Sequence, residues 1–441
     1  MNQSSGRLGL VFVLLSGLLS PASTVSGARP ENSDPVAARG DGERPTTITR
    51  IQGVLTIVSG DPRPGVPFPQ VESFFLRQSS GAEIELIFET GQLAALGGTG
   101  QLDGRAVEVV LEPTGESISK SSTRPPAVVR SLRILNASTV GKAAVVAKAV
   151  TGAQPWVSVL CKFSDVSKEP KPRSFFQGMY ASAYPALDHY WRQLSYNNVN
   201  VSGSTAVAWV TLPYPVSHYE SSSSEKLSDM AVDCTAAADH LVYFPDFVGI
   251  NLMFNSTFGP YAWGGSRYMT LDGQTKRYRV TWEPPWGYGN IAVIAHEMGH
   301  GFGLPHSNNA DGDADPYDNP WDVMSNSWGY ALSDSTYGTV AKGTIAYHAD
   351  ILGWIPPSQK LDVDSAGIYT ETVDNLELPS TANLRLVTVR IPDSSRYYTV
   401  EVRDLVSYDA RLPGFAVVIH EVYPSRKEDA WLVDVENPAN G

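Results

Sequence analysis

The stretch of residues 296–306, which reads HEMGHGFGLPH, constrains this chain more than any other part of its sequence. It has the form H-E-x-x-H-x-x-G-x-x-H, in which three histidines and one glutamate recur at fixed spacing. Residues 291–295 are apolar and follow Asn290, a residue type that begins helices well, so we expect a helix here. Such a helix places His296 and His300 one turn apart on the same face.

Two imidazole rings one turn apart can hold a single small cation, and Zn²⁺ favours nitrogen ligands in a tetrahedral shell. Gly303 can adopt a positive φ and turn the chain, which lets His306 return as the third ligand. A histidine in a helix is more often structural than a ligand, but the complete pattern favours a metal site. We predict that His296, His300 and His306 bind Zn²⁺, and that Glu297 takes a proton from the water that zinc acidifies.

The composition indicates a folded, acidic protein. The chain has 441 residues, of which 18% are charged and 10% aromatic, so it can form two or three domains rather than a disordered chain. Its formal net charge is −13, and this argues against a nucleic-acid partner, because phosphate binding needs a basic face. Proteins or peptides are the expected partners, and the oligomeric state is left open.

The N-terminus has the features of a secretory signal peptide, which we assign to residues 1–28. Arg7 supplies a positive charge, residues 8–19 are apolar, and small residues follow before a cleavage site near position 28. The alternative is a membrane anchor, but the apolar run is short for a membrane span, and no later stretch is long enough. We therefore expect a secreted protein, extracellular or periplasmic, with no membrane span after signal removal and with a linker over residues 29–45.

Cys161 and Cys234 are the two cysteines of the chain. An oxidising compartment would allow them to form one disulfide across a long loop. Cys161 lies in an apolar, strand-like run, and a buried free thiol there is nearly as well supported as the disulfide. Both possibilities stay open at this point.

Residues 46–150 show the alternation of short strands and predict an all-β domain of about five strands. A small barrel of the OB type fits that number. OB folds often bind oligonucleotides or sugars, but this segment has no basic and aromatic stripe, so we do not assign that function. A pro-domain and a passive structural module are the two interpretations of this domain.

Strands and helices alternate over residues 155–360, which we predict to be a catalytic domain. Within it, residues 261–282 predict a hairpin that turns at Asp272 and Gly273, and residues 343–354 a closing helix. Residues 361–441 are again β-rich and predict a small C-terminal sandwich-like domain. The chain stops in a strand-like region, which leaves open whether this domain is truncated.

An acidic loop follows the third histidine. Carboxylates are the ligands that Ca²⁺ prefers, and four aspartates in this loop are candidates: Asp311, Asp313, Asp315 and Asp318. The loop lacks the distal glutamate of the calcium-binding helix–loop–helix pattern, and a solvated acidic loop is the slightly favoured interpretation. Calcium is therefore a second candidate cofactor beside zinc.

Several segments together resemble the metzincin metallopeptidases of the gametolysin or immune-inhibitor-A kind. These segments lie within residues 156–435 and read VLCKFSD, HEMGHGFGLPHS, YDNPWDVMS, HADILGW, YYTVEVRD and FAVVIHEV. The second of them, which contains the zinc motif, is the most specific. The resemblance implies an α+β catalytic domain with a mixed sheet, a zinc-site helix and a methionine turn. In this chain an N-terminal OB-like domain and a C-terminal β-sandwich-like domain would flank that catalytic domain.

The resemblance also implies roles for particular residues. Met324 matches the methionine of the turn beneath the zinc histidines. Some metzincins have a zinc-binding tyrosine two residues later, but Asn326 stands there, and Tyr330 is a nearby candidate for stabilising the transition state. An edge strand before the zinc helix pairs with extended substrates in this superfamily, and the matching stretch is Trp263, Gly264, Gly265 and Ser266.

These features predict a secreted zinc-dependent endopeptidase, made as a zymogen, that hydrolyses peptide bonds with Glu297 as general base. The alternative is a secreted binding or adhesion protein with a vestigial zinc site. Several metzincin pro-domains silence the metal with a cysteine, but neither cysteine lies within residues 46–150. An aspartate or a blocking segment could replace that cysteine, and the sequence singles out no such residue. Cleavage specificity and physiological substrate are also open.

Overall fold

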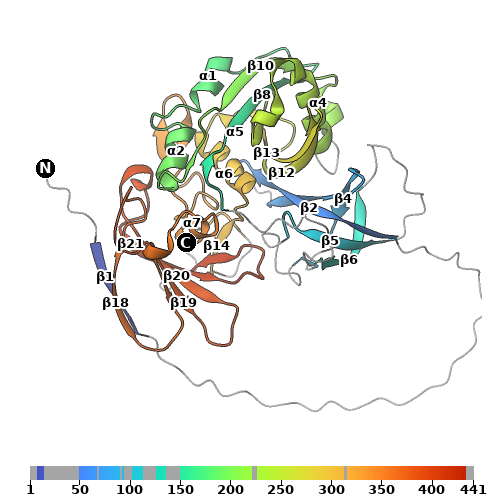
Figure 1. Ribbon diagram of the computed structural model, residues 1–441. Helices are drawn as coiled ribbons and strands as arrows, with labels where there is room; N and C mark the ends of the chain where they lie inside the picture. Colours follow the sequence, from blue (N-terminus) through green and yellow to red (C-terminus); the bar gives the residue numbers. More distant parts are fainter. Residues whose placement is uncertain are drawn as a thin grey trace, which may run out of the picture.

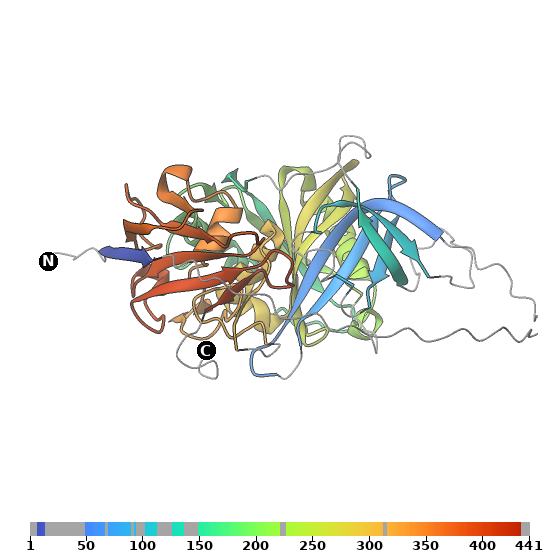
Figure 2. The same cartoon turned by 90° about the horizontal axis from the view of Figure 1, so that it is seen from below.

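The computed structural model describes nine stretches of the chain: residues 7–13, 49–66, 69–89, 92–93, 102–112, 126–135, 149–220, 226–311 and 315–433. The predicted linker 29–45, most of the predicted signal peptide, Asp313 and the last eight positions, 434–441, lie outside them. In Figure 1 the central part, residues 149–360, is green to yellow, the N-terminal barrel blue to cyan and the C-terminal sheet orange to red. Figure 2 shows the barrel and the C-terminal sheet on opposite sides of the central part.

The N-terminal domain is a barrel of five strands, as the sequence predicts. Its strands are β2 (Thr49–Pro62), β3 (Val71–Arg77), β4 (Glu83–Ile87), β5 (Ala106–Leu111) and β6 (Ala127–Ile134). They follow the order β2-β3-β4-β6-β5, and pairing of β5 with β2 closes the barrel. Alternating apolar residues such as Leu55, Leu76 and Val107 fill its interior.

The central part contains five strands of mixed direction in the order β10-β8-β11-β13-β12. These strands are β8 (Trp156–Lys162), β10 (Thr205–Thr211), β11 (Gly249–Phe254), β12 (Tyr261–Leu271) and β13 (Gln274–Glu283). Strands β10, β8, β11 and β13 run parallel to one another, and β12 runs antiparallel to β13. Asp272 and Gly273 form the predicted hairpin turn between them, with φ of 48° and 72°.

Helices surround this sheet, and their buried faces follow the apolar spacing of the sequence. They are α1 (Arg173–Gly178), α2 (Leu187–Leu194), α3 (Val216–Tyr219), α4 (Leu227–Ala238), α5 (Pro285–Tyr288) and α6 (Ile291–Phe302), whereas α7 (Ala346–Ile351) packs against the C-terminal part. On α2, Tyr190, Trp191 and Leu194 are buried, as an amphipathic pattern requires. Two-stranded pairs complete the part: β7 (Gly152–Ala153) with β9 (Val199–Asn200), and β15 (Leu332–Asp334) with β16 (Gly338–Val340).

Strand β2 joins the barrel to the sheet of the central part. It is 14 residues long, and its last residues pair with β12 in antiparallel register, from Val58 opposite Gly265 to Pro62 opposite Tyr261. The barrel and the central strands therefore form one continuous sheet of ten strands. Figure 1 shows β2 extending from the barrel toward β12 and α6.

The C-terminal part is a six-stranded sheet in the order β14-β22-β21-β20-β19-β17. Its strands are β14 (Ser307–Asn309), β17 (Lys360–Val363), β19 (Leu386–Arg390), β20 (Tyr397–Arg403), β21 (Ala416–Val422) and β22 (Ala430–Leu432). Strand β14 follows His306 directly, so the sheet crosses the boundary predicted near residue 360. A separate pair is formed by β1 (Arg7–Val13) and β18 (Ile368–Asp374), and Val373 of β18 packs into the apolar cluster of the six-stranded sheet.

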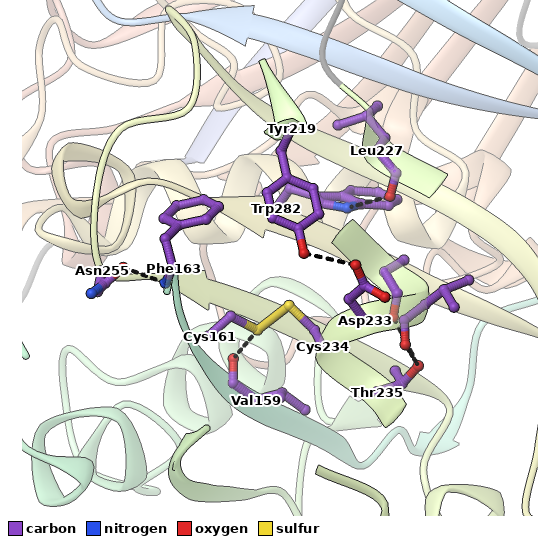
Figure 3. The surroundings of a disulfide bond; sticks show 12 residues. Val159, Cys161, Phe163, Tyr219, Leu227, Asp233, Cys234, Thr235, Asn255 and Trp282 are labelled. Carbon is purple, nitrogen blue, oxygen red and sulfur yellow. Dashed lines mark hydrogen bonds between the residues drawn. A yellow bond between two sulfur atoms is a disulfide. The ribbon is translucent and has the colours of Figure 1, made fainter. Parts of the chain in front are cut away.

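Cys161 and Cys234 form a disulfide, which decides the question that the sequence left open. The bond joins β8 to α4 over a Cα–Cα distance of 5.8 Å. Figure 3 shows it in the packed layer between the sheet and α4, near Tyr219, whose hydroxyl donates to Asp233. No helix in the described part of the chain is long and apolar enough to span a membrane.

Candidate metal centre

Helix α6 carries the first two histidines and ends where the sequence predicts. Asn290 precedes the helix, and Gly303 follows it with a φ of 98°, in the left-handed region that favours glycine. The amide of Leu304 donates to the carbonyl of Gly299 and closes the helix end. The chain then reverses and brings His306 against the face of α6 that carries His296.

The three histidines converge on one point. Nε2 of His296 lies 3.1 Å from Nε2 of His306, and Nε2 of His300 lies 3.2 Å from each of the other two. A tetrahedral zinc ion with Zn–N bonds near 2 Å separates its nitrogen ligands by about 3.3 Å. All three rings are buried. The three nitrogens therefore fit a single ion.

Backbone carbonyls orient two of these rings. Nδ1 of His296 lies 2.7 Å from the carbonyl oxygen of Val323, and Nδ1 of His300 lies 2.8 Å from that of Leu304. A carbonyl only accepts, so each Nδ1 carries the proton and donates it. This leaves the Nε2 lone pairs directed at the common point, as metal binding requires.

Met324 lies beneath the histidines. Its side chain is fully buried against Gly299, the residue before His300. Asp322 holds this turn in place: its carboxylate accepts from the amide of Met324 at 3.2 Å and from the hydroxyl of Ser307 at 2.7 Å. The turn is therefore tied both to the zinc helix and to the strand that follows His306.

The structure adds a fourth potential metal ligand that the sequence did not indicate, Asp61 at the end of β2. Its Oδ1 lies 2.8 Å from Nε2 of His306, and its Oδ2 lies 3.3 Å from His300 and 3.4 Å from His296. The ligand atoms of Asp61 and the three histidines lie within 4.8 Å of one another, and this buried group can hold a metal ion. The position of Asp61 comes from the pairing of β2 with β12, which joins residues about 200 positions apart.

Asp61 is ionised in this setting. Burial by itself raises its pKa, but electrostatic interactions and hydrogen bonds with the imidazoles of the three histidines bring the pKa well below its ordinary value. A carboxylate oxygen and three imidazole nitrogens form the kind of donor set that zinc accepts. The residues present therefore fit a zinc ion.

Glu297 is buried beside the first histidine. Among the described residues, neither of its carboxylate oxygens has a hydrogen-bond partner. Burial, together with the charges of Asp61 and Glu283, raises its pKa well above the ordinary value. It lines a cavity of about 690 Å³ together with His296, Asp61 and Trp286. A buried carboxylate facing a cavity is suited to exchange a proton with a molecule held there.

The tyrosine nearest to this site is Tyr317 and not Tyr330. The hydroxyl of Tyr317 donates to Oδ1 of Asp61 at 2.5 Å, and its ring stacks edge-on against His306. Burial raises its pKa well above the ordinary value, so the hydroxyl stays a donor. Tyr330 is 52% exposed, and its ring lies near the ammonium group of Lys342. The sequence pointed to Tyr330 only because it follows Met324.

The stretch predicted to bind substrate lies in β12, between β13 and β2, and its role stays a prediction. Trp263, Gly264, Gly265 and Ser266 belong to β12, and a Cβ on Gly264 would lie 2.3 Å from the carbonyl oxygen of Glu297. A side chain at 264 would therefore push β12 away from α6. The pairing of β12 with β2 was not predicted.

The acidic loop uses part of its carboxylates within the protein. Oδ1 of Asp315 accepts from the amide of Tyr317, and Oδ1 of Asp318 accepts from the amide of Asn309. Asp311 is described, whereas Asp313 lies outside the described residues. Within the described ranges, the group of Asp61 and the three histidines is the one cluster of potential metal ligands found. Calcium binding by this loop stays a prediction.

Comparison with known proteins identifies no protein family that matches this chain and no curated protein that is similar to it in sequence.

Proposed function

We propose that the chain is a zinc-dependent endopeptidase of the metzincin type, similar to the gametolysin and immune-inhibitor-A peptidases. The observation that carries the proposal is the convergence of three Nε2 atoms at 3.1–3.2 Å beside the buried carboxylate of Glu297. Three imidazoles around one position favour zinc over calcium or magnesium, which prefer oxygen ligands.

Glu297 is the general base in this proposal. Zinc bound to the three histidines would polarise the peptide carbonyl and make water acidic enough to lose a proton near neutral pH. Glu297 accepts that proton and then delivers it to the leaving amine nitrogen. Its raised pKa suits both steps, because the group can hold the proton between them.

Other residues bind and orient the substrate. The edge of β12 offers backbone groups to an extended peptide, which is recognition by strand addition. Trp286, Val293 and Trp328 line the cavity next to Glu297 and provide apolar surface for a substrate side chain. The Tyr317 hydroxyl, which donates to Asp61 in this structure, would donate to the negative charge that develops on the attacked carbonyl.

The predicted signal peptide belongs to this proposal and implies secretion. The Cys161–Cys234 disulfide supports it, because such bonds persist in oxidising compartments. A binding or adhesion protein with a vestigial site is the competing proposal. It gives no reason to keep the carboxylate of Glu297 buried without a partner, which costs stability.

The test uses Gly60→Val/Asp61→Ala with and without Glu297→Gln, because Asp61 lies against the three histidines and a side chain at position 60 would meet the ring of Trp263 and push β2 from β12. We expect stoichiometric zinc in both proteins and hydrolysis of casein where Glu297 is present. The added Glu297→Gln should lower hydrolysis about 10³-fold, the scale of general-base catalysis. Glu169→Gln, which alters a surface ion pair with Lys162, is the matched control and should leave hydrolysis unchanged. Equal hydrolysis with and without Glu297 would refute its assignment as base.

A further inference from the structure

We propose that strand β2 of the N-terminal barrel is an internal inhibitor, which keeps the metal centre closed with the Asp61 carboxylate and occupies the substrate strand position on β12. This inference rests on the proposed peptidase function, because it describes how that site is regulated. Two separate observations support it: the position of one carboxylate and the pairing of one strand.

The carboxylate takes the position that catalysis needs open. A catalytic zinc site has three protein ligands, and water or substrate takes the fourth position. Here Asp61 lies within 2.8–3.4 Å of all three histidine nitrogens, on the side of the group that they leave open. A zinc ion bound by the histidines would have Asp61 as its fourth ligand, and no water could take that place.

The strand occupies the edge at which a substrate would bind. Residues 58–62 of β2 pair in antiparallel register with residues 261–265 of β12. The fit is close: a Cβ on Gly60 would lie 2.6 Å from the ring of Trp263, and one on Gly265 would lie 2.4 Å from the carbonyl oxygen of Ile57. An extended peptide can use the same backbone groups of β12 only after β2 has left them.

The chain on the other side of Asp61 follows the cavity. Residues 62–66 line it together with Trp286, Val293 and Trp328 of the central part. The segment therefore passes over the metal centre with paired strand on one side and a cavity on the other, as a bound peptide would. The Asp61 carboxylate at the metal position keeps out the water that would be needed to cut it.

Side-chain contacts hold the barrel in this position. Arg267 of β12 pairs with Glu83 of β4, and its guanidinium lies 3.9 Å from the ring centre of Phe75. Arg277 of β13 pairs with Asp103 of the barrel. Arg267 is almost fully buried, so this contact depends on the barrel staying in place. Opening the site therefore requires separation of β2 from β12 and not a small rotation of Asp61.

The test reads access to the metal without relying on hydrolysis. The full chain is loaded with Co²⁺ in place of zinc, and its visible absorption is titrated with acetohydroxamate, a small ligand that binds to open metal positions. The variants are Asp61→Ala, Asp61→Asn and Gly60→Val/Asp61→Ala, since a side chain at position 60 meets the ring of Trp263 and should separate β2 from β12. The control is Glu169→Gln, which alters an ion pair with Lys162 and leaves the metal ligands and the barrel contacts intact. Hydrolysis of a casein substrate is measured on the zinc forms.

We expect acetohydroxamate to change the absorption spectrum of the Asp61 variants but not of the wild type or the control, and to bind to Asp61→Ala at least tenfold more tightly than to the wild type. Hydrolysis should rise at least tenfold in Gly60→Val/Asp61→Ala and stay lower in Asp61→Ala, in which β2 still covers β12. Unchanged access to the metal in Asp61→Ala, or equal hydrolysis in Asp61→Ala and the double variant, would overturn the inference. Open access without hydrolysis in the double variant would overturn the peptidase proposal, while the closure by Asp61 would stand.

Discussion

Met324 places its sulfur directly against Gly299: a Cβ on residue 299 would lie 2.4 Å from Sδ and 3.2 Å from Cε. Only a glycine at 299 lets the methionine pack beneath the turn of α6 that carries His300. The same turn supplies the Val323 carbonyl that orients His296. The floor of the metal centre therefore depends on the close approach of these two residues.

We expect Gly299→Ala to loosen this floor. The added methyl group must displace Met324, and overpacking of this kind costs roughly 1–3 kcal/mol of stability. Shifting the turn also moves the carbonyl partner of His296, so zinc affinity should fall by about tenfold or more. Urea unfolding and competition with a chelator measure the two effects. Gly414→Ala is the control, since a Cβ there meets no atom within 4 Å, and equal behaviour of the two variants would contradict the prediction.

Tyr317→Phe tests the assignment of the tyrosine. In the Gly60→Val/Asp61→Ala background, loss of the hydroxyl removes a donor to the developing negative charge, so kcat should fall about 10- to 100-fold with little change in KM. Tyr330→Phe should leave kcat unchanged, because Tyr330 is half exposed and lies near Lys342. Steady-state kinetics on a peptide substrate separates the two. A larger loss with Tyr330→Phe would restore the prediction made from the sequence.

The disulfide should contribute to stability and not to metal binding. It closes a loop with a sequence separation of 73 residues, which corresponds to roughly 4 kcal/mol in the chain-entropy description. We expect the free energy of unfolding of Cys161→Ala/Cys234→Ala, measured with urea, to be lower by about that amount. The double variant should still bind zinc stoichiometrically. Reduction of the wild-type protein should produce the same shift. Loss of zinc in a still-folded double variant would contradict the prediction.

Asp429 should make the protein less stable as pH rises through the acidic range. Burial raises its pKa from 3.8 to about 6, so the folded protein holds this proton more strongly than the unfolded chain. Stability from this group is full below about pH 4 and is lost as pH rises to about 6, by roughly 3 kcal/mol. Asp429→Asn keeps an acceptor for the Tyr347 hydroxyl and removes the titration.

Unfolding free energies of the two proteins at pH 4 and pH 7 measure this effect. The free energy of unfolding of Asp429→Asn, relative to that of the wild type, should be higher at pH 7 than at pH 4. Glu169→Gln, which changes an exposed carboxylate, should show no such trend. Parallel pH profiles for wild type and Asp429→Asn would show that Asp429 titrates normally.

The elements predicted from the sequence are those whose signals are local. The helix that carries His296 and His300 follows from an N-cap residue, an apolar run and a terminal glycine, all within 14 consecutive positions. The hairpin at Asp272 and Gly273 and the five strands of the barrel follow in the same way from alternation and turn residues. Each of these patterns depends on backbone preferences that neighbouring residues determine.

Asp61 marks what only the tertiary structure decided. In the sequence it is one aspartate between Gly60 and Pro62, with nothing around it that suggests a metal ligand. It reaches His306 because β2 pairs with β12, and pairing between distant strands depends on the packing of whole domains rather than on local propensity. Tyr317 likewise reaches the site through the fold of the chain after His306. The sequence by itself determined the three histidines and Glu297, because one helix and one turn bring them together. The fourth potential ligand, Asp61, and the strand that covers the site depend on contacts across the whole molecule.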